Sequence, residues 1–484
     1  MKPMRLLTPV EATDLDRATF ALPSYHSRNF IQLAGASVVQ KLRFFSLSEK
    51  PTLILVGPGH NGDDGRVVAT LLQEAGTRAQ IWDLATEKSV DTTLFENFEV
   101  VIDALFGVGL SRSIEGLAFE VIEALNLART HRRNTARRLT IVAVDVPSGL
   151  DAQTGWPRGT AVHADHTITM QAAKPGFFQN EGPRLTGHLS IARLPYPQNL
   201  FKEFASSHFA CGIATAHQLL PRRSLASNKG DHGVVNIVAG SAKYPGAGVL
   251  CARSALRTGA GYVRLIQFED VYPDWFQIPE SLFEKWDRIP QTLDPRACWV
   301  VGPGLANESQ TRTLIQRLLK SNCDKVILDA TALNVLSQAK IDLPPEWILT
   351  PHPKELARLM QCSVPEVQAD RFRAATIAHQ KWGATILLKG YKSIVHSGGK
   401  SYVILRGHSA LAKAGSGDVL AGLLGSLRAQ GLEAVQASVA GAVLHAFTAD
   451  LWLRTGDPAS LNPSDIIELL PSAQKEIKAW RARV

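Results

Sequence analysis

The sequence predicts an α/β protein of two domains, each with helices on both faces of a mainly parallel sheet. Short apolar runs rich in branched residues alternate with helical patterns along most of the chain. Strands that are apolar on both faces and alternate with helices are typical of parallel sheets covered on both sides. The alternation breaks over residues 194–221, which contain three prolines and no sustained strand signal, and then restarts. A chain of 484 residues is long enough for two domains of ordinary size.

The first half of the chain begins with three predicted strands, at residues 53–56, 100–102 and 141–144. Each run is rich in branched residues and is followed by a turn signal. A helix is predicted to open at Gly65, because apolar residues follow it at helical spacing. We expect this domain to span residues 1–212 and to be a Rossmann-like three-layer sandwich.

The second half of the chain repeats the pattern with its own strands. They are predicted at residues 234–238, 299–301, 326–328 and 385–388. A long helix with an apolar stripe is expected near the end of this series, after a glycine-rich loop. We expect this second domain to span residues 213–484.

The composition limits the kinds of partner and compartment. A formal net charge of +8 favours anionic ligands but does not establish nucleic-acid binding. The densest basic run, between Arg129 and Arg138, is interpreted as a solvated surface segment. The five cysteines form no CxxC pair, which favours free thiols in a reducing compartment over disulfides or a zinc site. No apolar run is long enough to span a bilayer, so we expect a cytoplasmic protein with no membrane or nucleic-acid partner.

A first candidate site lies at the loop Gly57–Gly65, which joins a predicted strand to a predicted helix. The next two strands end in carboxylates, Asp103 and Asp145. Ligands of open parallel sheets bind beyond the carboxyl ends of the strands, so these groups converge if the strands are neighbours. Asn61, Asp103 and Ser148 offer only hard oxygen ligands, which suit an alkali or alkaline-earth cation better than zinc. Spacing alone also allows Asp103 and Asp145 to be turn caps.

Three segments of this half resemble, in order, the motifs GxGNNGGDG, DALFGTGL and VDxPSGLDxxTG of the NAD(P)H-hydrate epimerase domain. They are residues 53–70, 101–110 and 144–155. The last reads VDVPSGLDAQTG, and the three matches in the same order make the resemblance specific. It extends over residues 10–210.

The resemblance implies an epimerase site. Asp145 would be the acid/base group acting at C6 of the hydrated nicotinamide. A positioned carboxylate suits that task, because opening the ring or protonating the hydroxyl makes C6 planar. The implied ligands of a potassium ion are Asn61, Asp103 and Ser148. The residues implied to contact the substrate, besides Asp145, are His60, Asn61, Gly62, Asp63, Asp64, Gly107, Val108, Gly109, Leu110, Ser111, Arg112 and Ser113.

The first loop departs from the family motif at two positions. His60 replaces an asparagine and Asp63 replaces a glycine. A glycine at position 63 would tolerate positive φ or the close approach of an anion, whereas Asp63 adds a negative charge. The alternative interpretation is therefore an N-terminal domain that binds its ligand without catalysis.

A second candidate site is the loop Gly415–Gly422, where Asp418 stands at the start of a helix. A carboxylate there repels a polyphosphate unless it serves as the base for a hydroxyl that attacks the phosphate. The simpler interpretation is a carboxylate at a helix N-terminus.

The second half also resembles the ribokinase-like fold, and within it the NAD(P)H-hydrate dehydratase branch. The motifs KGxxG, GPG, TPHPxE and GSGDVLAG occur in the order typical of that branch, with Lys354 in place of a glycine. The resemblance implies a ribokinase-like three-layer sandwich. Residues implied to contact the hydrate are Ala247, Gly304, His352 and Asp418. Residues implied to contact the adenine nucleotide are Lys389, Gly390, Tyr391, Lys392, Ser393 and Gly417.

Together the two resemblances imply a bifunctional NAD(P)H-hydrate repair enzyme. One domain would interconvert the R and S hydrates of NADH and NADPH. The other would dehydrate the S form with ADP and Mg2+, giving AMP and phosphate, and the protein would assemble as a tetramer or larger oligomer. An ATP-dependent small-molecule kinase is the alternative, because ribokinase-like kinases use the same aspartate to activate a hydroxyl.

Overall fold

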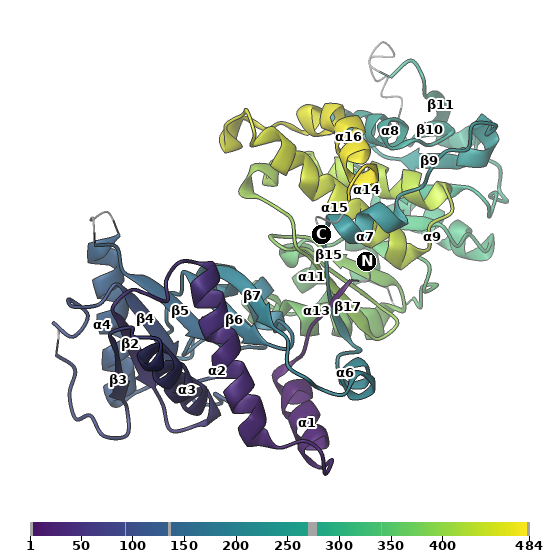
Figure 1. Cartoon of the computed structure of the whole chain (residues 1–484). Coiled ribbons are helices and arrows are strands. Elements are labelled where there is room, and N and C mark those ends of the chain that lie inside the picture. The colour runs from purple at the N-terminus through teal and green to yellow at the C-terminus, as the bar shows by residue number, and fades with distance from the viewer. Residues whose placement is uncertain (1–2, 92, 134–136, 270–277, 340, 482–484) are drawn as a thin grey trace. The chain divides into compact units, whose positions relative to one another are not determined.

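A computed structural model describes residues 3–91, 93–133, 137–269, 278–339 and 341–481 (Figure 1). The chain divides into two compact units, one of residues 5–208 and one of residues 209–484 with the first residues up to Met4. Strand β8 (His208–Cys211) follows directly on the first unit and joins the sheet of the second. The sequence pattern missed this strand, which is only four residues long.

The N-terminal unit is built on a six-stranded sheet in the order β3-β2-β4-β5-β6-β7, and every neighbouring pair is parallel. Its strands are β2 (Thr52–Val56), β3 (Ala79–Asp83), β4 (Val100–Ala104), β5 (Thr140–Val144), β6 (His166–Met170) and β7 (His188–Ala192). Its helices are α1 (Pro9–Phe20), α2 (Ser27–Phe44), α3 (His60–Glu74), α4 (Gly116–Arg132), α5 (Gly182–Leu185) and α6 (Gln198–Phe204), with a 3-10 turn η1 (Pro175–Phe178).

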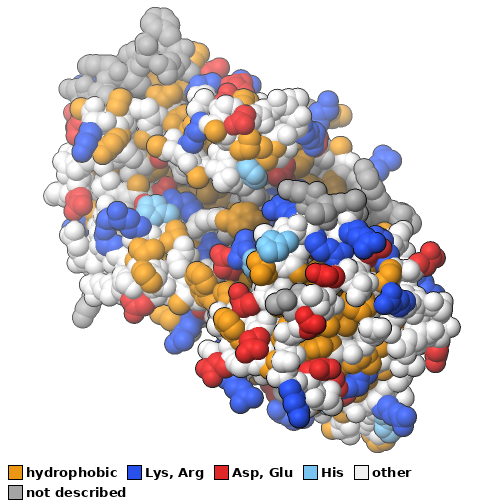
Figure 2. Space-filling view, turned by 90° about the vertical axis from the view of Figure 1, so that its left-hand side faces the viewer, with side chains coloured by type: hydrophobic (Ala, Val, Ile, Leu, Met, Phe, Trp, Pro, Cys, Tyr) orange, Lys and Arg blue, Asp and Glu red, His pale blue; other side chains and the backbone are white. Residues whose placement is uncertain are grey.

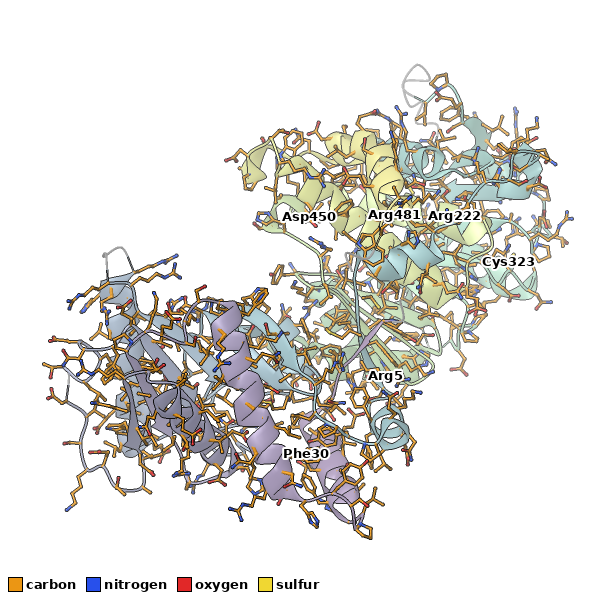
Figure 3. All side chains as sticks on the ribbon, viewed as in Figure 1. Arg5, Phe30, Arg222, Cys323, Asp450 and Arg481 are labelled. Carbon is orange, nitrogen blue, oxygen red and sulfur yellow. The ribbon has the colours of Figure 1, made fainter. Side chains whose placement is uncertain are left out.

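The sheet of this unit is buried on both faces, as predicted. Ile54 and Ile102 pack with α2 and α3 in one apolar cluster. Leu53 and Val101 face the opposite side and pack with α4. All five residues of β2 and of β4 are buried, which explains why both strands are apolar except for Thr52 and Asp103. On α2, Phe30 (Figure 3) packs edge-on against the ring of Tyr196.

Helix α3 begins earlier than the sequence predicted. We expected it to open at Gly65, but it starts at His60 with Gly59 as the N-cap residue. The Asn61–Asp64 segment therefore belongs to the start of the helix rather than to a loop. This segment lies against the strand ends, since a Cβ atom added to Gly62 would stand 2.0 Å from the carbonyl oxygen of Gly57.

The C-terminal unit contains an eleven-stranded sheet in the order β1-β8-β17-β16-β15-β14-β13-β12-β9-β10-β11. Besides β8, its strands are β1 (Met4–Arg5), β9 (Val234–Val238), β10 (Tyr262–Gln267), β11 (Leu282–Lys285), β12 (Cys298–Val301), β13 (Val326–Leu328), β14 (Ile348–Leu349), β15 (Thr385–Leu388), β16 (Ile394–Ser397) and β17 (Lys400–Ile404). Neighbouring strands from β11 to β15 pair parallel, whereas β15, β16 and β17 pair antiparallel.

Helices surround this second sheet. They are α7 (Ile213–Leu219), α8 (Pro245–Thr258), α9 (Glu308–Lys320), α10 (Thr331–Ser337), α11 (Pro353–Met360), α12 (Val364–Ala369), α13 (Arg371–Trp382), α14 (Ser416–Ala429), α15 (Ala434–Trp452) and α16 (Pro463–Lys478). The 3-10 turns are η2 (Lys229–His232), η4 (Trp286–Arg288), η5 (Ser409–Leu411) and η6 (Pro458–Ser460). Helices α8, α14 and α15 share one large apolar cluster with the strands. The four strands expected here are β9, β12, β13 and β15, so the predicted two-domain α/β class is confirmed.

Helix α15 is long and apolar enough to cross a membrane by length and composition. However, 83% of its apolar window is buried inside the protein, as in the core helix of a globular domain. On the face shown in Figure 2, basic side chains are interspersed with acidic ones. All five cysteines are free, as expected.

Candidate functional sites

The first candidate site lies at the carboxyl ends of β2, β4 and β5, which are neighbours in the N-terminal sheet. Asp103 is the fourth residue of β4, and Asp145 follows the last residue of β5. Gly57 follows β2, and a Cβ atom there would lie 1.9 Å from the carbonyl oxygen of Leu105. Only glycine allows this close approach of the two strand ends.

Asp103 is fully buried and bonded to Ser148. Its carboxylate accepts the Ser148 backbone N–H at 2.7 Å and the Ser148 hydroxyl at 2.5 Å. Burial raises the pKa of Asp103 to about 6, although both bonds from Ser148 act in the opposite direction. The Ser148 hydroxyl oxygen also accepts the N–H of Phe106 at 2.9 Å, which ties the β5 loop to the β4 loop.

Asn61 completes the oxygen-rich corner predicted to hold a cation. Its side chain is buried, and neither amide atom has a hydrogen-bond partner in the part of the chain that the structure describes. It lies against Gly107, where an added Cβ atom would be 3.5 Å from the Asn61 Oδ1 atom. An unsatisfied buried polar group costs roughly 1–3 kcal/mol, so this amide is suited to a ligand that the chain does not supply.

Asp145 is held in an uncommon backbone conformation and in an ion pair. Its φ is 61°, a left-handed value for a residue other than glycine. One carboxylate oxygen accepts bonds from the Thr169 hydroxyl at 3.0 Å, the Met170 N–H at 3.0 Å and the Lys174 ammonium at 2.5 Å. The Lys174 side chain is only 3% exposed, so this is a buried pair. Strained backbone of this kind is common at functional sites.

Further acidic groups surround Asp145. Burial raises the pKa of Asp64 to about 8, and the negative charges of Asp145, Asp63 and Asp16 add to the shift. Asp64 is therefore mostly protonated at neutral pH. Asp16, on α1, accepts a hydrogen bond from the Tyr196 hydroxyl at 2.5 Å, and burial raises its pKa as well.

The remaining predicted contact residues of this half are placed around the same strand ends. In the first turn of α3, His60 is exposed and Gly62 is buried. Asp63 has helical backbone, so it does not need the positive φ that the glycine motif suggested. The loop after β4 is half-buried to exposed and includes Gly107, Val108, Gly109, Leu110, Ser111, Arg112 and Ser113.

The second candidate site surrounds the start of α14. Gly415 has φ of 93° and is its N-cap residue, which places Asp418 in the first turn, as expected. Burial and the negative charge of Asp329 raise the pKa of Asp418 to about 7, while Lys389 acts in the opposite direction. The buried hydroxyl of Ser416 contacts the Nε2 atom of His445 at 3.2 Å.

Lys389 lies among carboxylates at this site. Its ammonium group donates to Asp329 at 2.7 Å and stands 3.6 Å from Glu355. Burial alone would lower the pKa of Lys389, but the charges of Asp329 and Glu355 outweigh it and raise the pKa. A Cβ atom added to Gly417 would be 3.5 Å from the Lys389 Nζ atom, so the predicted nucleotide residues Lys389 and Gly417 are neighbours.

The predicted hydrate contacts form two groups. Gly304, with φ of 63°, packs on Ala247, because an added Cβ atom would stand 2.6 Å from the Ala247 Cβ atom. His352 is the N-cap residue of α11, and its Nδ1 atom accepts the N–H groups of Lys354 and Glu355, both at 3.1 Å.

The other predicted nucleotide residues form the turn between β15 and β16. Tyr391 is 54% exposed, and the Ser393 hydroxyl donates to the carbonyl of Gly390 at 3.0 Å. The Lys392 ammonium donates to the carbonyl of Leu405 at 2.5 Å, which directs it toward the protein.

Comparisons with known proteins match both halves. A sequence profile described as NAD(P)H-hydrate dehydratase matches residues 235–472, and one described as YjeF-related protein N-terminus matches residues 27–94 and 82–176. The bifunctional NAD(P)H-hydrate repair enzyme of Moorella thermoacetica is 31% identical over 98% of this chain and 97% of that protein. Its counterpart from Escherichia coli is 32% identical over 86% of this chain and 84% of that protein. The chain belongs to the family of bifunctional NAD(P)H-hydrate repair enzymes.

A known crystal structure supports the fold of the C-terminal half of this repair enzyme family member. A ribokinase-like superfamily protein from Enterococcus faecalis has a TM-score of 0.51 at 22% identity, covering 56% of this chain and 97% of that protein. At this level of identity the likeness concerns the fold alone.

Sequence reasoning missed several charged or polar residues of the two sites. Lys174, Asp16 and Tyr196 surround Asp145 and Asp64, and Asp329 and Glu355 surround Lys389. Two signals were available, since Asp329 follows a predicted strand and Glu355 ends the TPHPxE motif. Lys174 comes four residues after β6, whose sequence HTITM lacks the apolar run that marked the other strands, and nothing in the sequence near Asp16 indicates a site.

Proposed function

We propose that this protein repairs hydrated NADH and NADPH, with epimerisation at Asp145 and ADP-dependent dehydration at Asp418. One observation supports this most strongly. Each domain has a half-buried aspartate at a lysine–carboxylate ion pair. Asp145 is itself paired with Lys174, and Asp418 lies beside the pair of Lys389 with Asp329. Environments that separate the charge states of neighbouring carboxylates are the usual means of acid and base assignment.

In the epimerase site, Asp145 and Asp64 act as base and acid. Asp145, paired with Lys174, accepts the proton of the C6 hydroxyl as the C6–N1 bond breaks and a C6 aldehyde forms. Asp64, protonated near neutral pH, donates a proton to the enamine that is released. Rotation about the C5–C6 bond then presents either face of the aldehyde, and reversal of both proton transfers closes the ring as either epimer.

Asn61, Asp103 and Ser148 would hold a potassium ion in the same site. The unpartnered amide of Asn61 and the buried carboxylate of Asp103 fit a monovalent cation with oxygen ligands. When bound, the ion would compensate the Asp103 charge. The chain itself fixes the two strand ends by the Ser148 bonds to Asp103 and Phe106.

In the dehydratase site, Asp418 removes the proton from the C6 hydroxyl of the S hydrate. That oxygen attacks the terminal phosphoryl group of ADP, supplied with Mg2+, and AMP leaves as the phosphoanhydride bond breaks. The C6–O bond then breaks with departure of phosphate, and loss of the C5 proton restores the reduced nicotinamide. Lys389 is positioned to balance phosphate charge, and the N–H groups at the start of α14 can bind an anion.

The test uses an R and S mixture of hydrated NADH with ADP, Mg2+ and K+, followed by absorbance of the reduced nicotinamide. The wild type is expected to recover all of the hydrate faster than spontaneous epimer exchange permits. Asp145→Asn is expected to stop at the S fraction, and Asp418→Asn to recover none. A stable phosphorylated product without absorbance would favour the kinase alternative. An Asp145→Asn variant that behaves as wild type would favour a non-catalytic N-terminal domain. Cytoplasmic location and assembly into a tetramer or larger oligomer stay predictions.

A further inference from the structure

The proposed epimerase substrate has a pyrophosphate group, and the first turn of α3 is a poor place for it. The glycine-rich motif suggested that helix N-terminus as an anion site. The structure, however, places the carboxylate of Asp63 in that turn, and Asp64 follows directly after it. Arg66, one turn further along α3, pairs with Asp63 at 3.1 Å and with Asp83 at 2.8 Å, so its positive charge is already shared by two carboxylates and is not free for a phosphate. The charge distribution therefore favours another location for the pyrophosphate.

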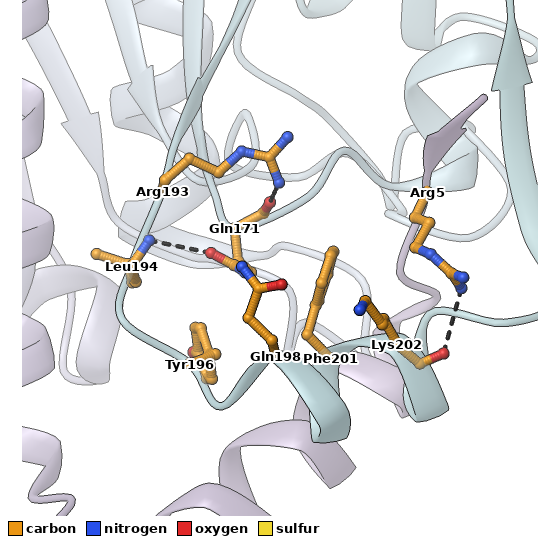
Figure 4. Close-up of a pocket in the computed structure, with 8 residues that line it drawn as sticks. All are labelled: Arg5, Gln171, Arg193, Leu194, Tyr196, Gln198, Phe201 and Lys202. Carbon is orange, nitrogen blue, oxygen red and sulfur yellow. Dashed lines mark hydrogen bonds between the residues drawn. The ribbon is translucent and has the colours of Figure 1, made fainter. Parts of the chain in front are cut away.

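A basic pocket lies in the same domain beyond the ends of β6 and β7 (Figure 4). Its volume is about 320 Å³, and it is lined by Arg5, Gln171, Arg193, Leu194, Tyr196, Gln198, Phe201 and Lys202. Three of these side chains are cationic and none is acidic. Neither Arg193 nor Lys202 forms an ion pair with any carboxylate among the residues that the structure describes. The pocket thus presents uncompensated positive charge.

The pocket is a formed cavity rather than a scatter of surface lysines. Gln171 is 8% exposed, and its side-chain oxygen accepts the N–H of Leu194 at 3.0 Å. Arg193 donates to the backbone carbonyl of Gln171 at 3.0 Å, which brings its guanidinium group to the pocket wall (Figure 4). Arg5 donates to the carbonyl of Lys202 at 3.2 Å on the opposite side.

The pocket adjoins the acid cluster around Asp145 at two points. Gln171 directly follows Met170, whose N–H donates to the Asp145 carboxylate at 3.0 Å. Tyr196 lines the pocket and donates its hydroxyl to Asp16. Strands β5, β6 and β7 are consecutive in the sheet, and neighbouring strands are about 4.8 Å apart. A pocket one or two strands from Asp145 is within the reach of the phosphates of a dinucleotide whose nicotinamide is at Asp145.

We propose that this pocket binds the pyrophosphate of the hydrated dinucleotide, with Arg193 and Lys202 as its charged ligands. The inference rests on the proposed epimerase function. In this proposal the phosphates bind beside β6 and β7, in a part of the domain that the three sequence motifs do not include. Arg193 and Lys202 are binding residues, since they lie away from the reacting carbon.

The test measures interconversion of the R and S hydrates of NADH by chromatography, without ADP, so that the dehydratase site is silent. The variants are Lys202→Gln and the double variant Arg193→Gln with Lys202→Gln. The double variant is expected to raise KM roughly tenfold or more, because hydrogen bonds to charged groups are strong, while kcat stays within about twofold. Inorganic pyrophosphate is expected to inhibit wild-type epimerisation and to lose this effect in the double variant.

Two comparison variants locate the effect. Lys88→Gln removes another exposed cation elsewhere in the domain and is expected to match the wild type. Arg112→Gln tests the rival location at the loop after β4. If Arg112→Gln alone raises KM and abolishes pyrophosphate inhibition while both pocket variants behave as wild type, the proposal is overturned. Lys202 is exposed, so its single variant tests the pocket without a risk to folding.

Failure of the pocket is distinguishable from failure of the proposed function. A wild type that does not interconvert the epimers would refute epimerisation itself. Calorimetric titration of the full-length protein with inorganic pyrophosphate then tests the pocket independently of activity. One binding event is expected to disappear in the double variant, and identical isotherms for wild type and double variant would overturn the assignment.

Discussion

Replacing Asp329 with asparagine tests whether Asp418 is the titrating base of the dehydratase site. The pKa of Asp418 is raised to about 7 by burial and by the charge of Asp329, and Lys389 lowers it. Asp329→Asn removes one raising charge and releases Lys389 from its 2.7 Å ion pair. Both changes favour the ionised form of Asp418, so its pKa is expected to fall in the variant.

The size of the effect follows from the titration of a single base. With a pKa of about 7, Asp418 is roughly one-eleventh ionised at pH 6 and ten-elevenths ionised at pH 8. The wild-type kcat/KM should therefore rise about tenfold between these values. In Asp329→Asn the ionised fraction at pH 6 is larger, so this ratio should fall toward one even if the overall rate declines.

The assay records initial rates of nicotinamide recovery from the pure S hydrate, with ADP and Mg2+, across this pH range. Asp294→Asn is the matched control, because Asp294 pairs with Arg296 at an exposed site of the same domain. Its pH profile should match that of the wild type. A profile for Asp329→Asn that superimposes on the wild type after scaling would refute the assignment of Asp418 as the base.

Three further predictions concern the epimerase site. Lys174→Met leaves the Asp145 carboxylate buried without its partner, so the free energy of unfolding should fall by about 3–5 kcal/mol in thermal or urea unfolding. The double variant that also carries Asp145→Asn should lose much less stability. Gly62→Ala should destabilise the domain by roughly 1–3 kcal/mol, because its Cβ atom would meet the Gly57 carbonyl. Gly109→Ala, whose Cβ atom would meet no atom within 4 Å, should unfold as the wild type does. Asn61→Leu should raise the melting temperature in potassium-free buffer and abolish any stabilisation by K+. A melting temperature that still rises with K+ as in the wild type would contradict the assignment of Asn61 as a ligand.

Sequence reasoning predicted the parts of the molecule whose structure is set by a pattern within consecutive residues. The strands β2, β4, β5, β9 and β12 are buried on both faces, and this burial is why most of their residues are apolar. The glycine loop before α14 was predicted from its glycines, and in the structure Gly415 has φ of 93°, a value that most other residues avoid. Strand β8 is too short for its composition to distinguish it from a turn.

Lys174, Asp16 and Tyr196 have no such signal, because distant segments bring them to the site. Lys174 and Asp145 are 29 residues apart, and Tyr196 and Asp16 are 180 residues apart. Separations of this length cannot be recognised from the short repeat of a helix or a strand. The pKa shifts that result depend on burial in the assembled domain, which the sequence around each residue does not report.

The departure of Asp63 from the family motif is compensated by its surroundings. Its backbone is helical, and Arg66 pairs with it at 3.1 Å while also pairing with Asp83 at 2.8 Å. The charge of Asp63 is also one of the causes that raise the pKa of Asp64 to about 8. Asp63, the departure that suggested a non-catalytic domain, therefore helps to keep Asp64, the proposed acid, protonated.

This compensation has a measurable consequence for the pH dependence of epimerisation. An acid with a raised pKa is active below that pKa and loses activity as the pH rises through it. Asp63→Gly restores the glycine of the motif, removes a negative charge beside Asp64 and should lower the pKa of Asp64. The falling limb of the rate profile, expected near pH 8 in the wild type, should then move to lower pH. A limb that stays in place would mean that Asp64 is not the proton donor, and Asp145 would then have to move both protons alone.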